Sequence, residues 1–178
     1  MVSILNSFYP GYSWDDSVER TAERFLSFLM EYVPEEEYNF KPTVFDADVN
    51  QMIGIYELPF SSICKHHLLP FMGYAHAAYL PNELMIGASK IPRLIDYWSR
   101  RPQTQELLTQ AIAVDLKRLL KAQGVAVLMI AEHTCMACRG VRKVGSRMIT
   151  SEMRGSFLTS GDARAEFMKA VEYAQNHR

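Results

Sequence analysis

The chain has 178 residues, with 19 Lys and Arg against 20 Asp and Glu, so its formal net charge is −1. This length is typical of one domain, and the near-neutral charge excludes the strongly basic composition of proteins that bind nucleic acid or membrane surfaces. Hydrophobic residues make up 48% of the chain, but the longest apolar run, residues 125–131, is far shorter than the ~18 residues that cross a bilayer. We therefore expect a globular protein with neither nucleic acid nor membrane as a partner.

The first predicted element is a helix that begins after Asp16 and ends before Pro34. Glu19, three residues after Asp16, completes a capping box at its start. Apolar residues recur at helical spacing on one face of this segment. They are Val18, Ala22, Phe25, Leu26, Leu29 and Val33.

Short strands follow between residues 43 and 88. Four segments rich in β-branched and aromatic residues are separated by Pro and Gly: 43–49, 52–58, 73–80 and 83–89. Strands that follow one another in this way pair most simply as an antiparallel sheet.

The clearest helix lies between Pro102 and Gly124, which match an N-terminal proline and a C-terminal glycine. Residues 125–133 then predict a buried strand, residues 147–157 another strand, and Asp162 the start of a last helix. In this order of predicted elements, strands come first and helices lie between and after them. Such an order indicates a single α+β domain.

The cysteines and most histidines gather in two short segments, 61–71 and 131–140. Zn²⁺ binds thiolates and imidazole nitrogens, and a catalytic zinc keeps three protein ligands and one open position. Cys64 and His67 have ligand spacing, and Cys135 would complete such a set. The three cysteines are too few for a disulfide framework, and the first residues lack the pattern of a secretory signal. We therefore expect a cytoplasmic, reducing compartment.

Two further histidines, His66 and His133, would stand beside the metal as groups able to transfer protons near neutral pH. Two alternatives remain open. Cys138 would make a fourth ligand and close the site, or the cysteines and histidines would be ordinary buried residues. For His76, inside a predicted strand, and His177, in the last helix, we favour a structural role.

Basic residues concentrate in segments 90–101 and 139–154. Arginine and backbone N–H groups suit phosphate oxygens, so these segments favour a polyphosphate ligand over a merely solvated charged face. Gln105 and Glu106 add a carboxylate that could accept the N–H edge of a purine, although an ordinary surface glutamate explains it equally well.

Four blocks of this sequence closely resemble the GTP cyclohydrolase I family: residues 64–81, 86–109, 124–146 and 150–157. The resemblance covers about residues 56–158, and the helix at 15–29 matches more weakly. It implies that Cys64, His67 and Cys135 bind Zn²⁺ and that His66 and His133 are the catalytic imidazoles. It implies that Glu106, with Gln105 beside it, binds guanine. It also implies that the triphosphate is bound by Ser89, Lys90, Arg93 and Arg139.

The family reaction opens the imidazole ring of GTP. Water activated by zinc attacks C8, His133 would protonate N7, His66 would assist opening of the ribose, and the products are formate and 7,8-dihydroneopterin triphosphate. This is the first step of folate, other pterin or deazapurine biosynthesis.

The resemblance also implies the tunnelling fold: an antiparallel four-stranded sheet with helices on one face, closed into rings that stack as a homodecamer of two pentamers. Residues 1–178 would form one such domain, with a helical region at 1–40 and the catalytic region at 41–178. The chain departs from the family at Lys65, where a glutamate is usual, and at Cys138, where a methionine is usual.

Overall fold

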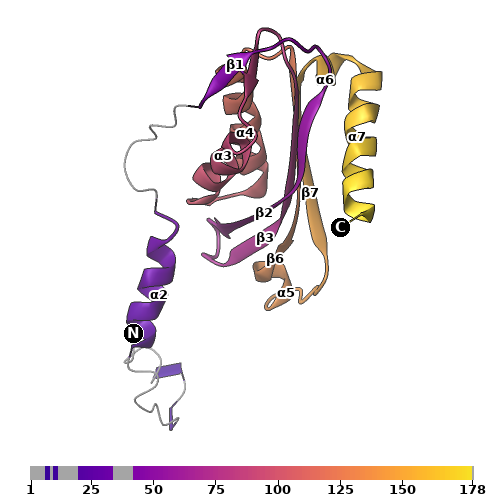
Figure 1. Cartoon of the computed structure of the whole chain (residues 1–178). Coiled ribbons are helices and arrows are strands. Elements are labelled where there is room, and N and C mark those ends of the chain that lie inside the picture. The colour runs from indigo at the N-terminus through magenta and orange to yellow at the C-terminus, as the bar shows by residue number, and fades with distance from the viewer. Residues whose placement is uncertain (1–6, 9, 12–19, 34–41, 178) are drawn as a thin grey trace.

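A five-stranded sheet organises the fold, with the strand order β5-β2-β3-β6-β7 (Figure 1). The computed structural model describes residues 7–8, 10–11, 20–33 and 42–177. Antiparallel pairing joins the four long strands, whereas β5 pairs with β2 in parallel. The strands are β2 (Ile53–Cys64), β3 (Pro70–Leu80), β5 (Pro102–Gln103), β6 (Gly124–His133) and β7 (Arg147–Gly155).

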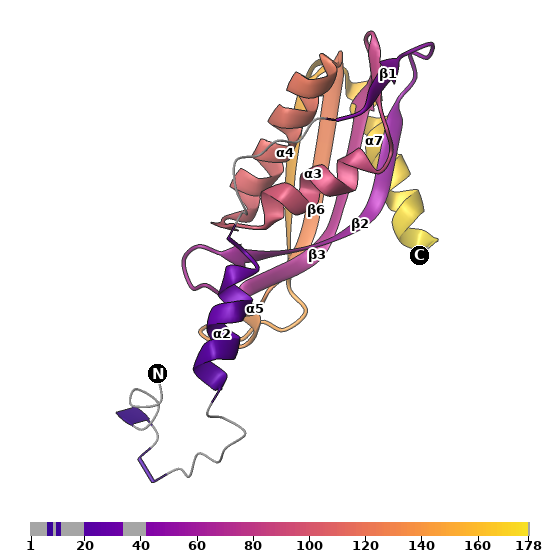
Figure 2. The ribbon, with the colours of Figure 1, turned by 60° about the vertical axis from the view of Figure 1, so that its left-hand side comes forward.

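Helices cover both faces of this sheet (Figures 1 and 2). On one face α3 (Lys90–Ser99) and α4 (Gln105–Leu120) bury Leu94, Ile112 and Leu116 against the strands. On the other face α6 (Ser156–Thr159) and α7 (Gly161–Asn176) bury three side chains against Ala78, Ala126 and Leu128. These three are Phe157, Phe167 and Val171. Because both its faces are covered, β6 is buried at eight of its ten positions and has the continuous apolar sequence of a central strand.

Two parts of the expected architecture are therefore wrong. The sheet has five strands rather than four, because Pro102 and Gln103 pair with Ile63 and Cys64 at one edge. Helices pack on two faces rather than one, because the aromatic side chains that follow β7 need a second apolar layer. The α+β class is correct, and the strand at 125–133 and the last helix are confirmed. The strand expected at 147–157 is confirmed as far as Gly155, because α6 begins at Ser156.

The helix expected between Pro102 and Gly124 is α4, but it is shorter at both ends. Thr104 caps it, since its hydroxyl accepts a hydrogen bond from the Leu107 N–H at 3.3 Å. At the other end Lys121 adopts φ 48°, so the chain turns before Gly124 starts β6.

No helix was expected from the sequence where α3 lies. Its apolar positions Ile91, Leu94 and Ile95 are buried in helical spacing, but the prolines and basic residues around them obscured the pattern.

The N-terminal region contributes α2 (Thr21–Met30) and the strand β1 (Val44–Asp46), which pairs with β4 (Leu84–Ile86) in a small separate sheet. Asp16, Val18, Glu19 and Pro34, which framed the first predicted helix, lie outside the described residues. Phe25 and Leu26 on α2 are exposed, so the described part of this chain leaves the expected apolar stripe uncovered. Among the described helices, none combines the length and the apolar character that crossing a membrane requires.

Candidate functional site

The turn between β2 and β3 positions two of the predicted metal ligands. Cys64 is the last residue of β2, and its carbonyl accepts hydrogen bonds from the N–H groups of His67 and Leu68 at 3.3 and 2.8 Å. The Cys64 N–H donates to the Leu69 carbonyl at 2.9 Å. These bonds form a tight turn that brings the His67 imidazole back over the end of the strand.

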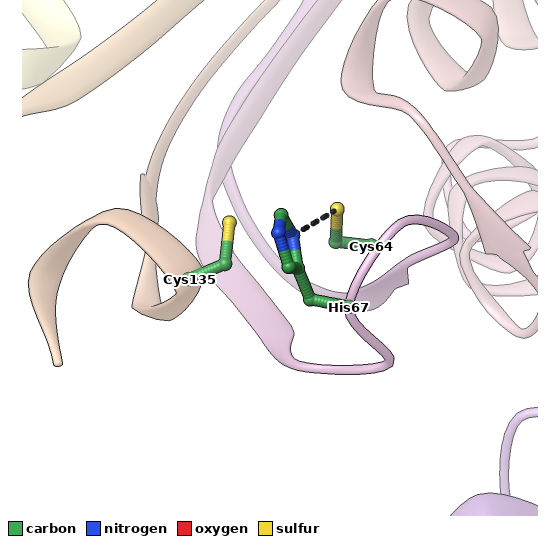
Figure 3. A group of neighbouring side chains, drawn as sticks. All are labelled: Cys64, His67 and Cys135. Atoms are coloured by element: carbon green, nitrogen blue, oxygen red, sulfur yellow. Dashed lines mark hydrogen bonds between the residues drawn. The ribbon is translucent and has the colours of Figure 1, made fainter. Parts of the chain in front are cut away.

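The third residue comes from the short helix α5 (Thr134–Ala137), which follows β6. Because β3 pairs with both β2 and β6, its first residues lie beside the ends of both strands, with Phe71 opposite His133. The Thr134 hydroxyl donates to the Pro70 carbonyl at 2.6 Å, which ties α5 to the start of β3. Cys135 therefore faces the turn that carries Cys64 and His67 (Figure 3).

The donor atoms of Cys64, His67 and Cys135 all lie within 4.8 Å of one another, and Cys64 Sγ is 3.9 Å from His67 Nδ1. Ligands around a tetrahedral zinc would lie roughly 3.5–3.8 Å apart, given Zn–S and Zn–N bonds of about 2.3 and 2.0 Å. Small side-chain movements bring the three donors to that spacing, so this set of two thiols and one imidazole can hold a metal ion. Cys138 is exposed and is not a member of the group, so the described residues do not form the closed four-ligand site.

Electrostatics at these thiols favour a bound cation. Burial raises the pKa of Cys135, and the neighbouring Cys64 raises it further, while Arg139 acts in the opposite direction. Two thiolates this close together repel each other, and a divalent cation between them removes that repulsion and holds both in the deprotonated form.

The two predicted catalytic imidazoles stand in different surroundings. His66 is exposed, and its Nδ1 lies 3.7 Å from Cys64 Sγ. His133, the last residue of β6, is 9% exposed and stacks on Phe71 with ring centroids 4.6 Å apart. Burial lowers the pKa of His133, and the Glu106 carboxylate partly offsets this effect.

The two residues assigned to guanine also differ. Glu106 is exposed and lines a hollow of about 390 Å³ with Thr109, Gln110 and Glu152. Gln105 is completely buried, and its amide is occupied by partners within the chain, including His133 Nε2 at 2.9 Å. A purine in that hollow would meet Glu106 but would not reach the Gln105 amide.

The basic residues divide into two groups. Arg139 follows α5 and is exposed close to Cys135. Ser89, Lys90 and Arg93 lie at the start of α3, whereas the other end of α3 contacts β2 through the bond from Ser62 Oγ to the Ser99 carbonyl at 2.8 Å. A ten-residue helix is about 15 Å long, so Ser89 and Lys90 lie at the end of α3 that is remote from this contact.

Sequence reasoning missed Phe71 and Thr150, which support the site from within. Phe71 holds the His133 ring flat, and Thr150 binds the Gln105 amide at 3.0 Å. Neither residue carries a motif, because only the strand register places Phe71 opposite His133 and Thr150 opposite Met129.

Comparison with known proteins identifies the family of this chain. The GTP cyclohydrolase I family model matches residues 13–172. A GTP cyclohydrolase 1 from Hydrogenobaculum sp. is 39% identical over 156 residues, which cover 88% of this chain and 86% of that protein. A second from Nostoc sp. is 49% identical over 133 residues, covering 75% and 62%, and a third from Campylobacter jejuni is 44% identical over 135 residues, covering 76% and 71%.

Among solved structures, the apo form of the archaeosine synthase QueF-Like superposes with a TM-score of 0.49 at 12% identity, covering 58% of this chain and 93% of that one. That similarity is too weak to add to the assignment. The family match spans most of the sequence, and the relatives carry the same activity in their names. The chain therefore belongs to the GTP cyclohydrolase I family and is an enzyme of that family.

Proposed function

We propose that the protein hydrolyses GTP to formate and 7,8-dihydroneopterin triphosphate in a zinc-dependent reaction. The observation that carries this proposal is the group of Cys64, His67 and Cys135, whose donor atoms lie within 4.8 Å of one another. Zn²⁺ bound there supplies the Lewis-acid chemistry that makes water nucleophilic near neutral pH. The family assignment supports GTP as the substrate.

Each remaining side chain has a role in this proposal. His133 donates a proton to N7 of the purine, because C8 is a weak electrophile until the adjacent nitrogen is protonated. His66 is exposed beside Cys64, where it assists opening of the ribose. Glu106 accepts the N–H edge of guanine. The buried setting of His133 limits the access of bulk water to the proton that it transfers.

A second copy of the chain completes the site in our proposal. Ser89, Lys90 and Arg93 lie in the first half of α3, whereas the other end of this helix contacts β2. They would therefore bind the triphosphate of a GTP molecule held by a neighbouring subunit, together with that subunit's Arg139. The exposed apolar side chains of α2 support such an assembly, for which we propose the decamer of two pentamers.

Formate release tests the proposal. Purified protein with a measured zinc content is incubated with GTP, and formate and the pterin product are quantified with and without a chelator. We expect both products in equal amounts, loss of both after chelation, and recovery when zinc is added. Saturable GTP binding by zinc-loaded protein without formate would instead identify a catalytically weakened GTP-binding homologue. Formation of a different product from GTP would indicate another reaction of the same fold.

The oligomer is tested separately. Sedimentation of the purified protein should give the mass of ten chains. A monomer that turns over GTP would contradict the shared site.

A further inference from the structure

We infer that Gln105 is a positioning residue that fixes the orientation and the tautomer of His133, rather than a residue that reads the purine. This inference rests on the proposed function only for its catalytic consequence. The hydrogen bonds around the Gln105 amide carry it.

The amide group of Gln105 has one possible orientation. Its Nε2 lies 3.0 Å from the Met129 carbonyl, 3.1 Å from the Met148 carbonyl and 3.0 Å from Thr150 Oγ1. Two of these atoms are carbonyl oxygens, which only accept hydrogen bonds. An amide turned the other way would place its oxygen against both of them, inside a region that water does not reach. The NH₂ group therefore faces the two carbonyls, and Oε1 faces His133.

Two threonines complete the same network. Thr109 Oγ1 donates to the Gln105 carbonyl at 2.7 Å, so its hydroxyl proton is already committed. Thr150 Oγ1 lies 2.6 Å from Thr109 Oγ1 and therefore donates to it. Thr150 is then left as an acceptor for the Gln105 NH₂ group, which agrees with the orientation derived from the two carbonyls.

The orientation of the amide determines the tautomer of His133. Gln105 Oε1 can only accept, and it lies 2.9 Å from His133 Nε2. Nε2 must therefore carry a proton, and in the neutral ring Nδ1 is left as the basic nitrogen. No described residue hydrogen-bonds to Nδ1, and it is not one of the fully enclosed polar atoms. Nδ1 is therefore the ring nitrogen that a substrate can reach.

Phe71 and Gln105 together hold the ring in one plane and one rotation. The Phe71 and His133 rings are stacked with an interplanar angle of 2°. Stacking alone would allow the imidazole to turn over by half a turn about its Cβ–Cγ bond, but this would replace Nε2 by a carbon atom opposite Gln105 Oε1 and lose the hydrogen bond. Gln105 therefore holds the Nε2–H edge of the ring, and the Nδ1 edge is left for the substrate.

Gln105 also explains why the site depends on strands that are distant in sequence. Its amide joins the start of α4 to Met129 on β6 and to Met148 and Thr150 on β7. The residue that orients His133 is thus itself held by the sheet. If the amide moved, the His133 ring would lose its hydrogen bond, and α4 would lose its hydrogen bonds to β6 and β7.

Nuclear magnetic resonance can observe the tautomer without any substrate. The zinc-loaded protein is labelled with ¹⁵N in its histidine rings and measured as a solid at mildly alkaline pH. The His133 signals are assigned by their absence from His133→Ala. We expect the proton on Nε2 in the wild type and a mixture of tautomers in Gln105→Met. A wild-type proton on Nδ1 would overturn the inference. This measurement stands even if the protein does not turn over GTP, whereas absence of turnover would refute the proposed function alone.

Kinetics separate positioning from purine binding. In Gln105→Met we expect kcat for GTP to fall about 10- to 100-fold, as for other partners that orient a functional imidazole, while KM changes little. A raised KM with unchanged kcat would return Gln105 to the purine site and refute the inference.

Ile112→Ala is the matched control. Ile112 is buried on the same helix α4 but carries no hydrogen-bonding group, so its loss should lower stability while kcat per folded molecule stays within about 3-fold of the wild type. An equal loss of kcat in both variants, at equal loss of stability, would mean that Gln105 matters only for folding and would overturn the inference.

Discussion

His133 on β6 and His76 on β3 are both buried, but they have different hydrogen-bond partners. His133 ends β6 and His76 lies in the middle of β3; they are 9% and 0% exposed, and burial lowers the pKa of both. His133 hydrogen-bonds to the neutral Gln105 amide through Nε2, and no described residue hydrogen-bonds to its Nδ1. Both ring nitrogens of His76 face Glu57, whose N–H lies 3.3 Å from Nδ1 and whose Oε1 lies 3.5 Å from Nε2.

The difference arises from where each histidine sits on the sheet. The pairing of β2 with β3 shifts register between Ile55 and Leu58, and Glu57 in this bulge adopts φ 53°. The bulge turns Glu57 towards His76, whose ring lies 6.2 Å from the Tyr56 ring on a face of the sheet. The end of β6 lies instead beside the β2–β3 turn and α5, which carry the candidate metal donors Cys64, His67 and Cys135. Burial and a lowered pKa are therefore common to both histidines, and what separates them is that His133 ends its strand two residues before Cys135.

The largest expected effect is the loss of the metal. Cys135→Ala removes one of two thiolates, so we expect zinc content after dialysis to fall below one tenth of the wild-type value and GTP turnover to become undetectable. Zinc is measured by atomic emission on protein of confirmed mass. Cys138→Ala is the control and should keep its zinc, because Cys138 lies outside the donor group. Unchanged zinc in Cys135→Ala would refute the ligand set.

Next in size is the loss of the imidazole at the end of β6. His133→Ala should lower kcat by about 10²- to 10⁴-fold while zinc content and GTP affinity remain, because general acid–base groups contribute that much. Single-turnover kinetics and equilibrium GTP binding separate the two quantities. His76→Gln is the counterpart in the other region, and we expect its kcat per folded molecule to stay within about 3-fold of the wild type. Retained turnover in His133→Ala would remove the distinction between the two histidines.

A core substitution near His76 should affect stability alone. Phe167 on α7 is completely buried and contacts Phe157 and Tyr56 with ring centroids 6.1 and 6.2 Å away. Phe167→Ala should therefore lower the free energy of unfolding by about 3–5 kcal/mol through lost burial and a cavity. Denaturant titration measures this loss, and zinc binding by the folded protein should not change. A change in zinc affinity would show that the two regions are coupled.

The smallest effect concerns pH. Burial lowers the pKa of His76 below its ordinary 6.5, against the smaller opposing influence of Glu57. Below that ordinary value the unfolded chain binds more protons than the folded chain, so the free energy of unfolding decreases as pH falls. His133 adds to the same trend, since its pKa is also lowered.

Denaturation between about pH 5 and 8 measures this dependence. His76→Gln should flatten it, because the substitution removes the imidazole whose pKa is lowered by burial. An equal slope in wild type and His76→Gln would contradict the assignment to His76.

Local pattern was enough to predict several elements and the candidate ligands. The helical spacing between Pro102 and Gly124 and the apolar run at 125–133 specify α4 and β6, because periodicity and burial act within a few residues. Cys64 and His67 are three residues apart and share one turn, so their proximity also follows from the sequence. The distance to Cys135 does not, because it depends on β3 pairing with both β2 and β6.

The sequence by itself therefore determined the class of the fold, the residue types of the metal group and, through four long blocks, the family. Only the tertiary structure decided that β5 joins the sheet, that helices cover both faces, that Cys138 lies outside the donor group and that Gln105 faces His133. The physical reason is the distance along the chain over which each property is set. Side-chain chemistry and periodicity are properties of neighbouring residues, whereas register, burial and the direction of an amide depend on strands that meet only after folding.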